Sequence, residues 1–186
     1  MHPFAALPPS TRLPALGVLL VLTLALAWFL GDQGKPLKVG PAVPDGLLSA
    51  EFAWTAARWH AIAVAWGPDL QALARRLLTL DFVFALAYPL LLAMGCALVA
   101  EIRDAPQAAF GIFLSWAMLA AIPLEFMENA AMLQWLNRGP PARTGDALVR
   151  FVGVCAGLKF TLAFAALGYV LLAQLGLIAA RLGSER

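Results

Sequence analysis

Apolar residues form four long, uninterrupted runs along the chain, separated by shorter segments in which polar residues, prolines and glycines gather. Each run is long enough to cross the hydrocarbon core of a membrane, which takes about 20 helical residues. The runs are continuous and do not alternate between apolar and polar positions, so they predict helices and not barrel strands. The expected spanning helices are residues 13–30, 77–100, 109–136 and 147–180.

The first run also has the outline of a cleavable signal peptide. Arg12 precedes it, and Ala25-Leu26-Ala27 fits the small-x-small pattern at which such peptides are cut. Against cleavage, the apolar run continues through Trp28, and a tryptophan at the edge of a run is typical of a membrane interface. We therefore expect the first helix to be retained in the membrane.

The segment between the first two runs has two parts. Residues 31–46 hold four glycines and three prolines, which interrupt regular structure and predict an irregular linker. Residues 47–76 predict an amphipathic connector, because apolar side chains recur every three or four positions until Gly67-Pro68 interrupts them. The stripe consists of Leu48, Phe52, Thr55, Trp59, Ile62 and Trp66. The connector could lie on the bilayer surface or cap the bundle, and its modest lysine and arginine content favours the cap.

The overall composition places the whole chain in a membrane. Its 186 residues are 62% apolar and 13% charged, whereas a soluble domain is nearer half apolar and a quarter charged. A net charge of +2 is too small to indicate a basic surface that binds nucleic acid. Two cysteines and two histidines argue against a disulfide framework or a Cys/His metal site. We predict an all-α membrane protein of one domain, residues 1–186: a four-helix transmembrane bundle with an amphipathic helical connector between helices 1 and 2.

Ionisable residues interrupt the last three runs at positions where lipid would exclude a charge. They are Asp81 in the second run, Glu125 and Glu128 beside Asn129 in the third, and Arg150 and Lys159 in the fourth. At about 1.5 Å per residue, all five ionisable groups fall in the half of the bilayer nearest loops one and three. An isolated charge at mid-helix costs about 2.5–3.5 kcal/mol, so such residues normally face inward and pair. We expect these side chains to converge inside the bundle.

The balance of three carboxylates against two cations leaves one acid in excess. We expect Lys159 to pair with Glu125 or Glu128, and Arg150 to pair with Asp81 nearer the mouth of the bundle. Glu125, the deepest of the acids, is the expected proton carrier. Networks of this kind can also serve only to fix the register of packed helices, and the sequence does not separate the two roles.

Further residues indicate a cavity beside these charges. Tyr88 follows Asp81 by seven positions and shares its helix face, where a packed tyrosine with one hydrogen bond is the simplest role. Pro89 and Pro123 each free a backbone carbonyl, and such groups survive at membrane depth only inside protein or beside water. Small residues predict close helix contacts in the last span, at Gly153, Gly157 and Gly168.

In combination, these motifs resemble a family of uncharacterised bacterial four-span membrane proteins. The resemblance covers about residues 48–169 and is carried by Leu80-Asp81-Phe82-x-Phe84-x-x-x-Tyr88-Pro89, Glu125-x-x-Glu128-Asn129, Lys159, Ala65-Trp66-Gly67 and Arg75-Arg76. It implies a multi-pass protein of the bacterial inner membrane and supplies no chemistry. The chain is more loosely similar to the EXPERA group of sterol isomerases and the sigma-2 receptor, as an analogy only, because their acidic and histidine positions have no residue-by-residue match here.

The leading hypothesis is a membrane protein that binds a lipid or small amphiphile in a polar pocket opening towards loops one and three. The pocket would be lined by Asp81, Glu125, Glu128, Asn129 and Lys159, with Tyr88 and the connector at its entrance. If the protein is an enzyme, Glu125 or Glu128 would transfer a proton. One alternative is a proton- or ion-coupled permease, which with four spans would act as a homo-oligomer. Another is a structural subunit whose charges only lock the bundle. No metal or cofactor is expected.

Overall fold

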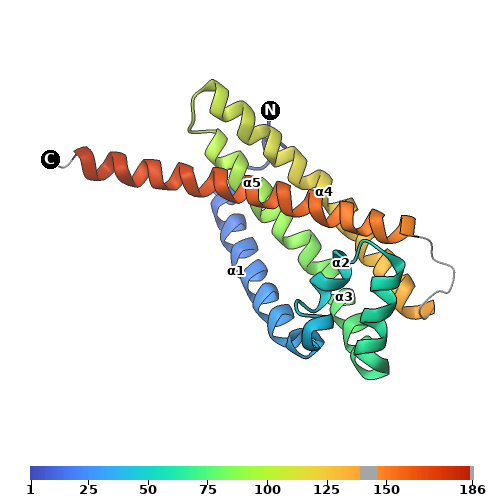
Figure 1. Ribbon diagram of the computed structural model, residues 1–186. Helices are drawn as coiled ribbons and strands as arrows, with labels where there is room; N and C mark the ends of the chain where they lie inside the picture. The colour runs from blue at the N-terminus through green and yellow to red at the C-terminus, as the bar shows by residue number, and fades with distance from the viewer. Residues whose placement is uncertain (139–145, 185–186) are drawn as a thin grey trace.

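The computed structural model describes residues 1–138 and 146–184, which are almost entirely helical (Figure 1). The elements in chain order are α1 (Pro9–Gln33), the short 3-10 helices η1 (Lys35–Leu37) and η2 (Gly40–Ala42), α2 (Leu47–Glu51), α3 (Ala56–Ala100), α4 (Ala105–Arg138) and α5 (Asp146–Ser184). Four of these, α1, α3, α4 and α5, contain stretches long and apolar enough to cross a membrane. The chain is therefore an all-α, multi-pass membrane protein, as its four apolar runs predict.

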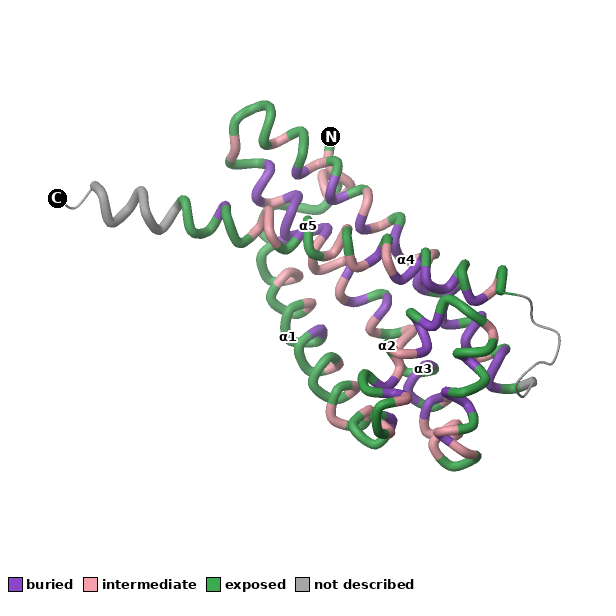
Figure 2. The backbone as a smooth tube through the Cα atoms, viewed as in Figure 1, coloured by how far each residue is buried: buried purple, intermediate pink, exposed green. Residues whose placement is uncertain are grey.

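The long helix α3 is the centre of the bundle. Helix α4 runs back along it after a short turn, and α5 crosses the pair (Figure 1). Helix α1 also packs against α3 but, within the described residues, hardly touches α5. Figure 2 shows the consequence: α1 is exposed along most of its length, while buried positions concentrate on α3 and α4 and where the connector meets them. The apolar outer face of α1 is thus left to the lipid.

The amino-terminal end of α1 is fixed to the turn between α3 and α4. The guanidinium group of Arg12 donates hydrogen bonds to a carboxylate oxygen of Glu101 and to the backbone oxygens of Leu7 and Ala5. The same Glu101 oxygen lies 2.8 Å from His2 Nε2. These contacts, together with the packing of α1 against α3, hold α1 to the bundle.

The connector differs from its predicted form, in which one amphipathic helix continues from residue 47 to the interruption at Gly67-Pro68. Helix α2 ends at Glu51, and the backbone then turns through Trp54, whose φ is +61°. A new helix begins after Thr55, whose side-chain oxygen accepts a hydrogen bond from the Arg58 N–H and caps it. The predicted interruption at Gly67 is present as a kink with φ +60° inside α3. Because of the break after α2, the apolar stripe does not lie on one helix.

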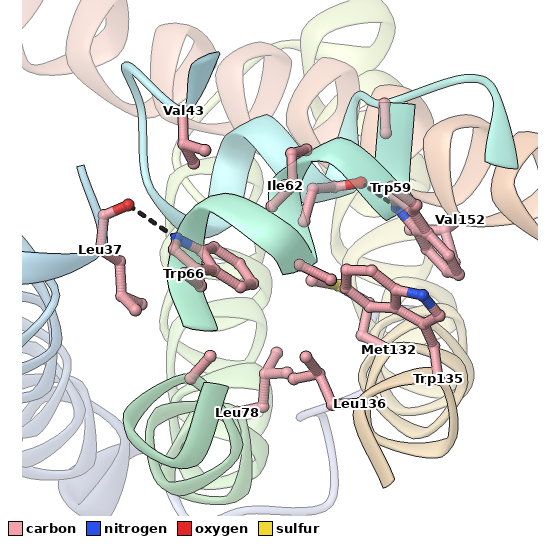
Figure 3. Close-up of a cluster of buried hydrophobic side chains, with 14 of the residues drawn as sticks. Leu37, Val43, Trp59, Ile62, Trp66, Leu78, Met132, Trp135, Leu136 and Val152 are labelled. Atoms are coloured by element: carbon pink, nitrogen blue, oxygen red, sulfur yellow. Dashed lines mark hydrogen bonds between the residues drawn. The ribbon is translucent and has the colours of Figure 1, made fainter. Parts of the chain in front are cut away.

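The connector packs as a cap over one end of the bundle, around three tryptophans (Figure 3). The rings of Trp59 and Trp135 stack with centroids 4.4 Å apart. The indole N–H of Trp59 donates to the Ala50 oxygen at 2.6 Å, and that of Trp66 donates to the Leu37 oxygen at 2.9 Å. These bonds satisfy the polar end of each buried indole while its ring fills the core. The first members of the predicted stripe, Leu48, Phe52 and Thr55, remain exposed.

Of the three glycines expected to permit close contact between helices, Gly153 permits a close contact, but with the turn between α2 and α3 and not with another helix. A Cβ atom on Gly153 would come within 2.9 Å of the Trp54 ring, so this glycine admits the connector to the surface of α5. The expectation is wrong for Gly157 and Gly168, which have open space at the Cβ position. A close approach that the sequence analysis did not single out occurs at Gly111, whose Cβ would overlap the Tyr169 side chain.

Candidate functional site: a buried carboxylate–lysine cluster

Lys159, in the middle of α5, is the centre of a buried ion-pair cluster. Its Nζ donates hydrogen bonds to Glu128 Oε1 at 2.9 Å and to Glu125 Oε2 at 3.2 Å. A third carboxylate oxygen, Oε2 of Glu51 at the end of α2, lies 3.2 Å from the same nitrogen. All four residues are buried, with exposed fractions of 9% or less. A single ammonium group therefore joins α2, α4 and α5.

Two hydrogen bonds extend the cluster from α4 to α3. Asn129 Nδ2 donates to Asp81 Oδ2 at 2.8 Å, and the Tyr88 hydroxyl donates to Glu125 Oε1. Asp81 and Tyr88 lie seven residues apart on α3 and are half-buried. As their spacing predicts, Glu125 and Asn129 share one face of α4 with Glu128 between them. We call the group Glu51, Asp81, Tyr88, Glu125, Glu128, Asn129 and Lys159 the carboxylate–lysine cluster.

Arg150 does not join this cluster. Its side chain is exposed and lies 3.8 Å from Asp146, one turn earlier on α5, while Asp81 bonds to Asn129 instead. The expected pairing of Arg150 with Asp81 is therefore wrong. The physical reason is helical geometry: Arg150 and Lys159 are nine residues apart, about two and a half turns, so they point to opposite sides of α5.

Glu51 is the member of the cluster that the sequence analysis missed. It belongs to the connector, where a glutamate on an amphipathic helix is normally an exposed polar residue. In the structure, α2 contacts α5 as well as α3. Glu51 is the last residue of α2, where the helix ends and the backbone turns. Nothing in the spacing of the polar residues marks Glu51, because its position depends on the turn at residues 52–55.

The cluster has a large excess of acid. In the described part of the chain it contains four carboxyl groups, from Glu51, Asp81, Glu125 and Glu128, and the single cation of Lys159. Oε2 of Glu128 is buried and accepts no hydrogen bond from any described group, and the buried Oε2 of Glu51 has the ion pair with Lys159 but no hydrogen bond. An uncompensated buried charge costs several kcal/mol, so protons or a cation from outside must neutralise part of this excess. The described residues offer no grouping of His, Cys, Asp and Glu suited to a metal ion.

A cleft of about 460 Å³ opens beside the cluster between α1, α3 and α5. Its polar wall is made by Glu51, Asp81, Tyr88, Glu125 and Lys159. The other walls are small or apolar, and consist of Ala27, Leu30, Gly31, Leu48, Phe84, Leu92, Phe160, Ala163, Phe164 and Leu167. The volume lies in the range of small-molecule sites, about 300–1,000 Å³. In the described residues few contacts join α1 to α5, so these two helices form separate sides of the cleft.

The carboxylate–lysine cluster and its cleft lie towards one end of the bundle. Beyond Tyr88, the helices pack through a buried cluster of small and apolar side chains: Ala93, Cys96, Leu114, Met118, Ala121 and Ala166. The buried hydroxyl of Ser115 is satisfied within this region, because it donates to the Ala93 oxygen at 2.7 Å. The described residues thus place a charged cluster and its cleft in one half of the bundle, with an apolar core in the other half.

Comparisons of the chain with protein-family models, with curated proteins and with solved structures find no match. The resemblance to the bacterial four-span family therefore stays a prediction from the motifs, and the case for a function depends on the geometry of the cluster and the cleft.

Proposed function

We propose that this protein binds a lipid or a small amphiphile in the cleft between α1 and α5. The polar end of the ligand lies against the carboxylate–lysine cluster, and its apolar part lies between the two helices. The observation that carries this proposal is the composition of the cleft wall. One end holds Glu51, Asp81 and Glu125, while the rest is formed by residues such as Leu30 and Leu167.

The position of the cleft between helices that are apolar and long enough to span the membrane favours a ligand that arrives through the membrane. An acyl chain that leaves the bilayer for an apolar cleft gains little hydrophobic free energy, because lipid tails are as apolar as leucine. Affinity and selectivity must therefore come mainly from the polar end of the ligand. Polar groups in a site of low dielectric constant are well suited to this role, since they interact more strongly there than in water.

The same geometry bears on the alternative functions. A permease needs a polar path through both halves of the bundle. In the described residues an apolar core separates the carboxylate–lysine cluster from the Arg12–Glu101 ion pair at the far end, so binding is the better-supported function. If the protein is also an enzyme, Glu125 is the proton-transfer group we propose. It lines the cleft and contacts both the Tyr88 hydroxyl and the Lys159 ammonium group.

We also propose that the protein resides in the inner membrane of a bacterium. Helical spans support this location, because the spanning proteins of the bacterial outer membrane are typically barrels. The family resemblance of the motifs points to the same compartment.

The test is photolabelling of the purified protein in lipid nanodiscs. The probes are three C12 amphiphiles that carry a diazirine in the chain and end in an alcohol, a carboxylic acid or an amine. The expected result is that at least one probe labels cleft residues, and that Ala163→Trp, which fills the cleft, reduces this labelling. Ala165→Trp is the matched control, because Ala165 lines a different groove, on the other side of α5. Equal labelling of all lipid-facing surfaces by every probe, unaffected by Ala163→Trp, would refute the proposal.

A further inference from the structure

We propose that the polar end of the ligand is a cation: the ammonium group of an amphiphilic amine. This inference rests on the proposed function and names its ligand class. It is drawn from the hydrogen-bonding character of the cleft wall, from the three buried carboxylates that share the ammonium group of Lys159, and from the charge of the carboxylate–lysine cluster.

The donors of the cleft wall are already engaged. Lys159 Nζ donates to Glu125 and Glu128 and lies 3.2 Å from Glu51 Oε2, so three carboxylate oxygens surround its three N–H bonds. The Tyr88 hydroxyl donates to the other oxygen of Glu125. Asn129, which stands behind the wall, donates to Asp81. A ligand that needs hydrogen-bond donors from the protein, such as a carboxylate or a phosphate, therefore meets side chains whose donors are taken.

The acceptors, in contrast, have capacity to spare. Glu51 lines the cleft and is only 9% exposed, and although its Oε2 lies 3.2 Å from Lys159 Nζ, no described group donates a hydrogen bond to that oxygen. Asp81 lines the same wall with one of its two oxygens bonded to Asn129. An ionised carboxylate accepts about four hydrogen bonds and donates none, whereas an ammonium group donates up to three. The wall is therefore complementary to a positively charged group with several N–H bonds.

The charge balance selects the same ligand. Four carboxyl groups face one lysine, so an anionic headgroup would add to an existing excess of negative charge. An alcohol would donate one hydrogen bond and compensate no charge. An ammonium group would donate hydrogen bonds and also compensate negative charge. Hydrogen bonds between charged partners are roughly twice as strong as those between neutral ones.

The test compares the three diazirine probes at pH 7 in the same nanodiscs. The amine is expected to label cleft residues about tenfold more efficiently than the alcohol, the difference given by one charge-assisted hydrogen bond. The carboxylic acid is expected to label them least. Glu51→Gln should reduce labelling by the amine and leave labelling by the alcohol nearly unchanged. Asp104→Asn is the control, because it removes an exposed carboxylate at the opposite end of the bundle.

The outcomes separate this inference from the function on which it rests. If the alcohol or the acid labels the cleft as well as the amine does, protons neutralise the cluster and the inference is wrong, while amphiphile binding stands. If no probe favours the cleft, both proposals fail. The selectivity among probes is measured on the unaltered protein, so the result does not depend on whether Glu51→Gln folds.

Discussion

Replacing Lys159 by methionine should destabilise the protein strongly, because it removes the one cation of the carboxylate–lysine cluster. Methionine has a similar length and fills the space of the lysine stem, so the change isolates the charge. Three carboxylates, from Glu51, Glu125 and Glu128, then lie close together with no cation among them. Removing one partner of a buried ion pair costs about 3–5 kcal/mol, which is the loss in free energy of unfolding that we expect at pH 7.

The loss in free energy of unfolding should depend on pH, and the uptake of protons by the variant decides whether the loss grows or shrinks as the pH falls. A glutamate with an ordinary pKa of about 4.3 can be neutralised at pH 7 for about 3.7 kcal/mol, so the Lys159→Met variant should fold with at least one additional proton. Each additional proton makes the loss relative to the wild type smaller as the pH falls, by about 1.4 kcal/mol per unit. Between pH 7 and pH 5 the loss should therefore shrink by about 2.7 kcal/mol and approach zero to two kcal/mol.

The assay is equilibrium unfolding by SDS in mixed micelles, followed by tryptophan fluorescence. The signal is suitable because three of the six tryptophans, Trp59, Trp66 and Trp135, form the buried core of the cap. Lys35→Met is the matched control: Lys35 is exposed and its pair with Asp32 is a surface ion pair, so the loss should stay below about 1 kcal/mol. A Lys159→Met loss under 1 kcal/mol at pH 7, or one that is equal at pH 5 and pH 8, would refute the reasoning.

Three other substitutions test separate parts of the structure. Adding Glu128→Leu to Lys159→Met should restore only part of the lost stability in the SDS assay, since two other glutamates still lack a cation; full recovery would mean that the pair acts alone. Gly153→Ala should cost about 1–3 kcal/mol because its Cβ meets a tryptophan ring, whereas Gly157→Ala, with open space, should be neutral or stabilising by up to about 1 kcal/mol. Glu125→Gln should lower amine labelling of the cleft while the SDS unfolding transition stays cooperative; undiminished labelling would remove Glu125 from the binding site.

The sequence was sufficient to predict the spanning helices and most of the cluster. The apolar runs are continuous, so helices are the only structures that satisfy their backbone in lipid without a partner strand. The spacing of Glu125, Glu128 and Asn129 places them on one face of α4 in any straight helix. The cost of a lone charge in lipid then requires Lys159 to face them. These inferences depend on local geometry and solvation, which a sequence contains.

Two features of the cluster differ from the prediction, for different reasons. Depth in the membrane alone places Arg150 inside the bundle, but its distance of nine residues from Lys159 puts it on the opposite face of the helix, and this spacing is present in the sequence. Glu51 is a different case, because it reaches the cluster only through the break at residues 52–55 and the packing of α2 against α5. Tertiary packing of this kind leaves no periodic signal in the sequence.

The presence of Glu51 changes the interpretation of the whole cluster. Charges that only fix helix register are least costly when they balance, as three acids and two cations nearly would. Four carboxyl groups with a single lysine are poorly suited to fixing helix register, since each uncompensated carboxylate destabilises the fold. Glu51, Asp81 and Glu125 line the cleft, whereas Glu128 alone of the four does not. We infer that the pair of Lys159 and Glu128 serves stability and that the cleft-lining acids serve recognition. Lys159→Met should therefore impair folding first, and Glu51→Gln should impair binding first.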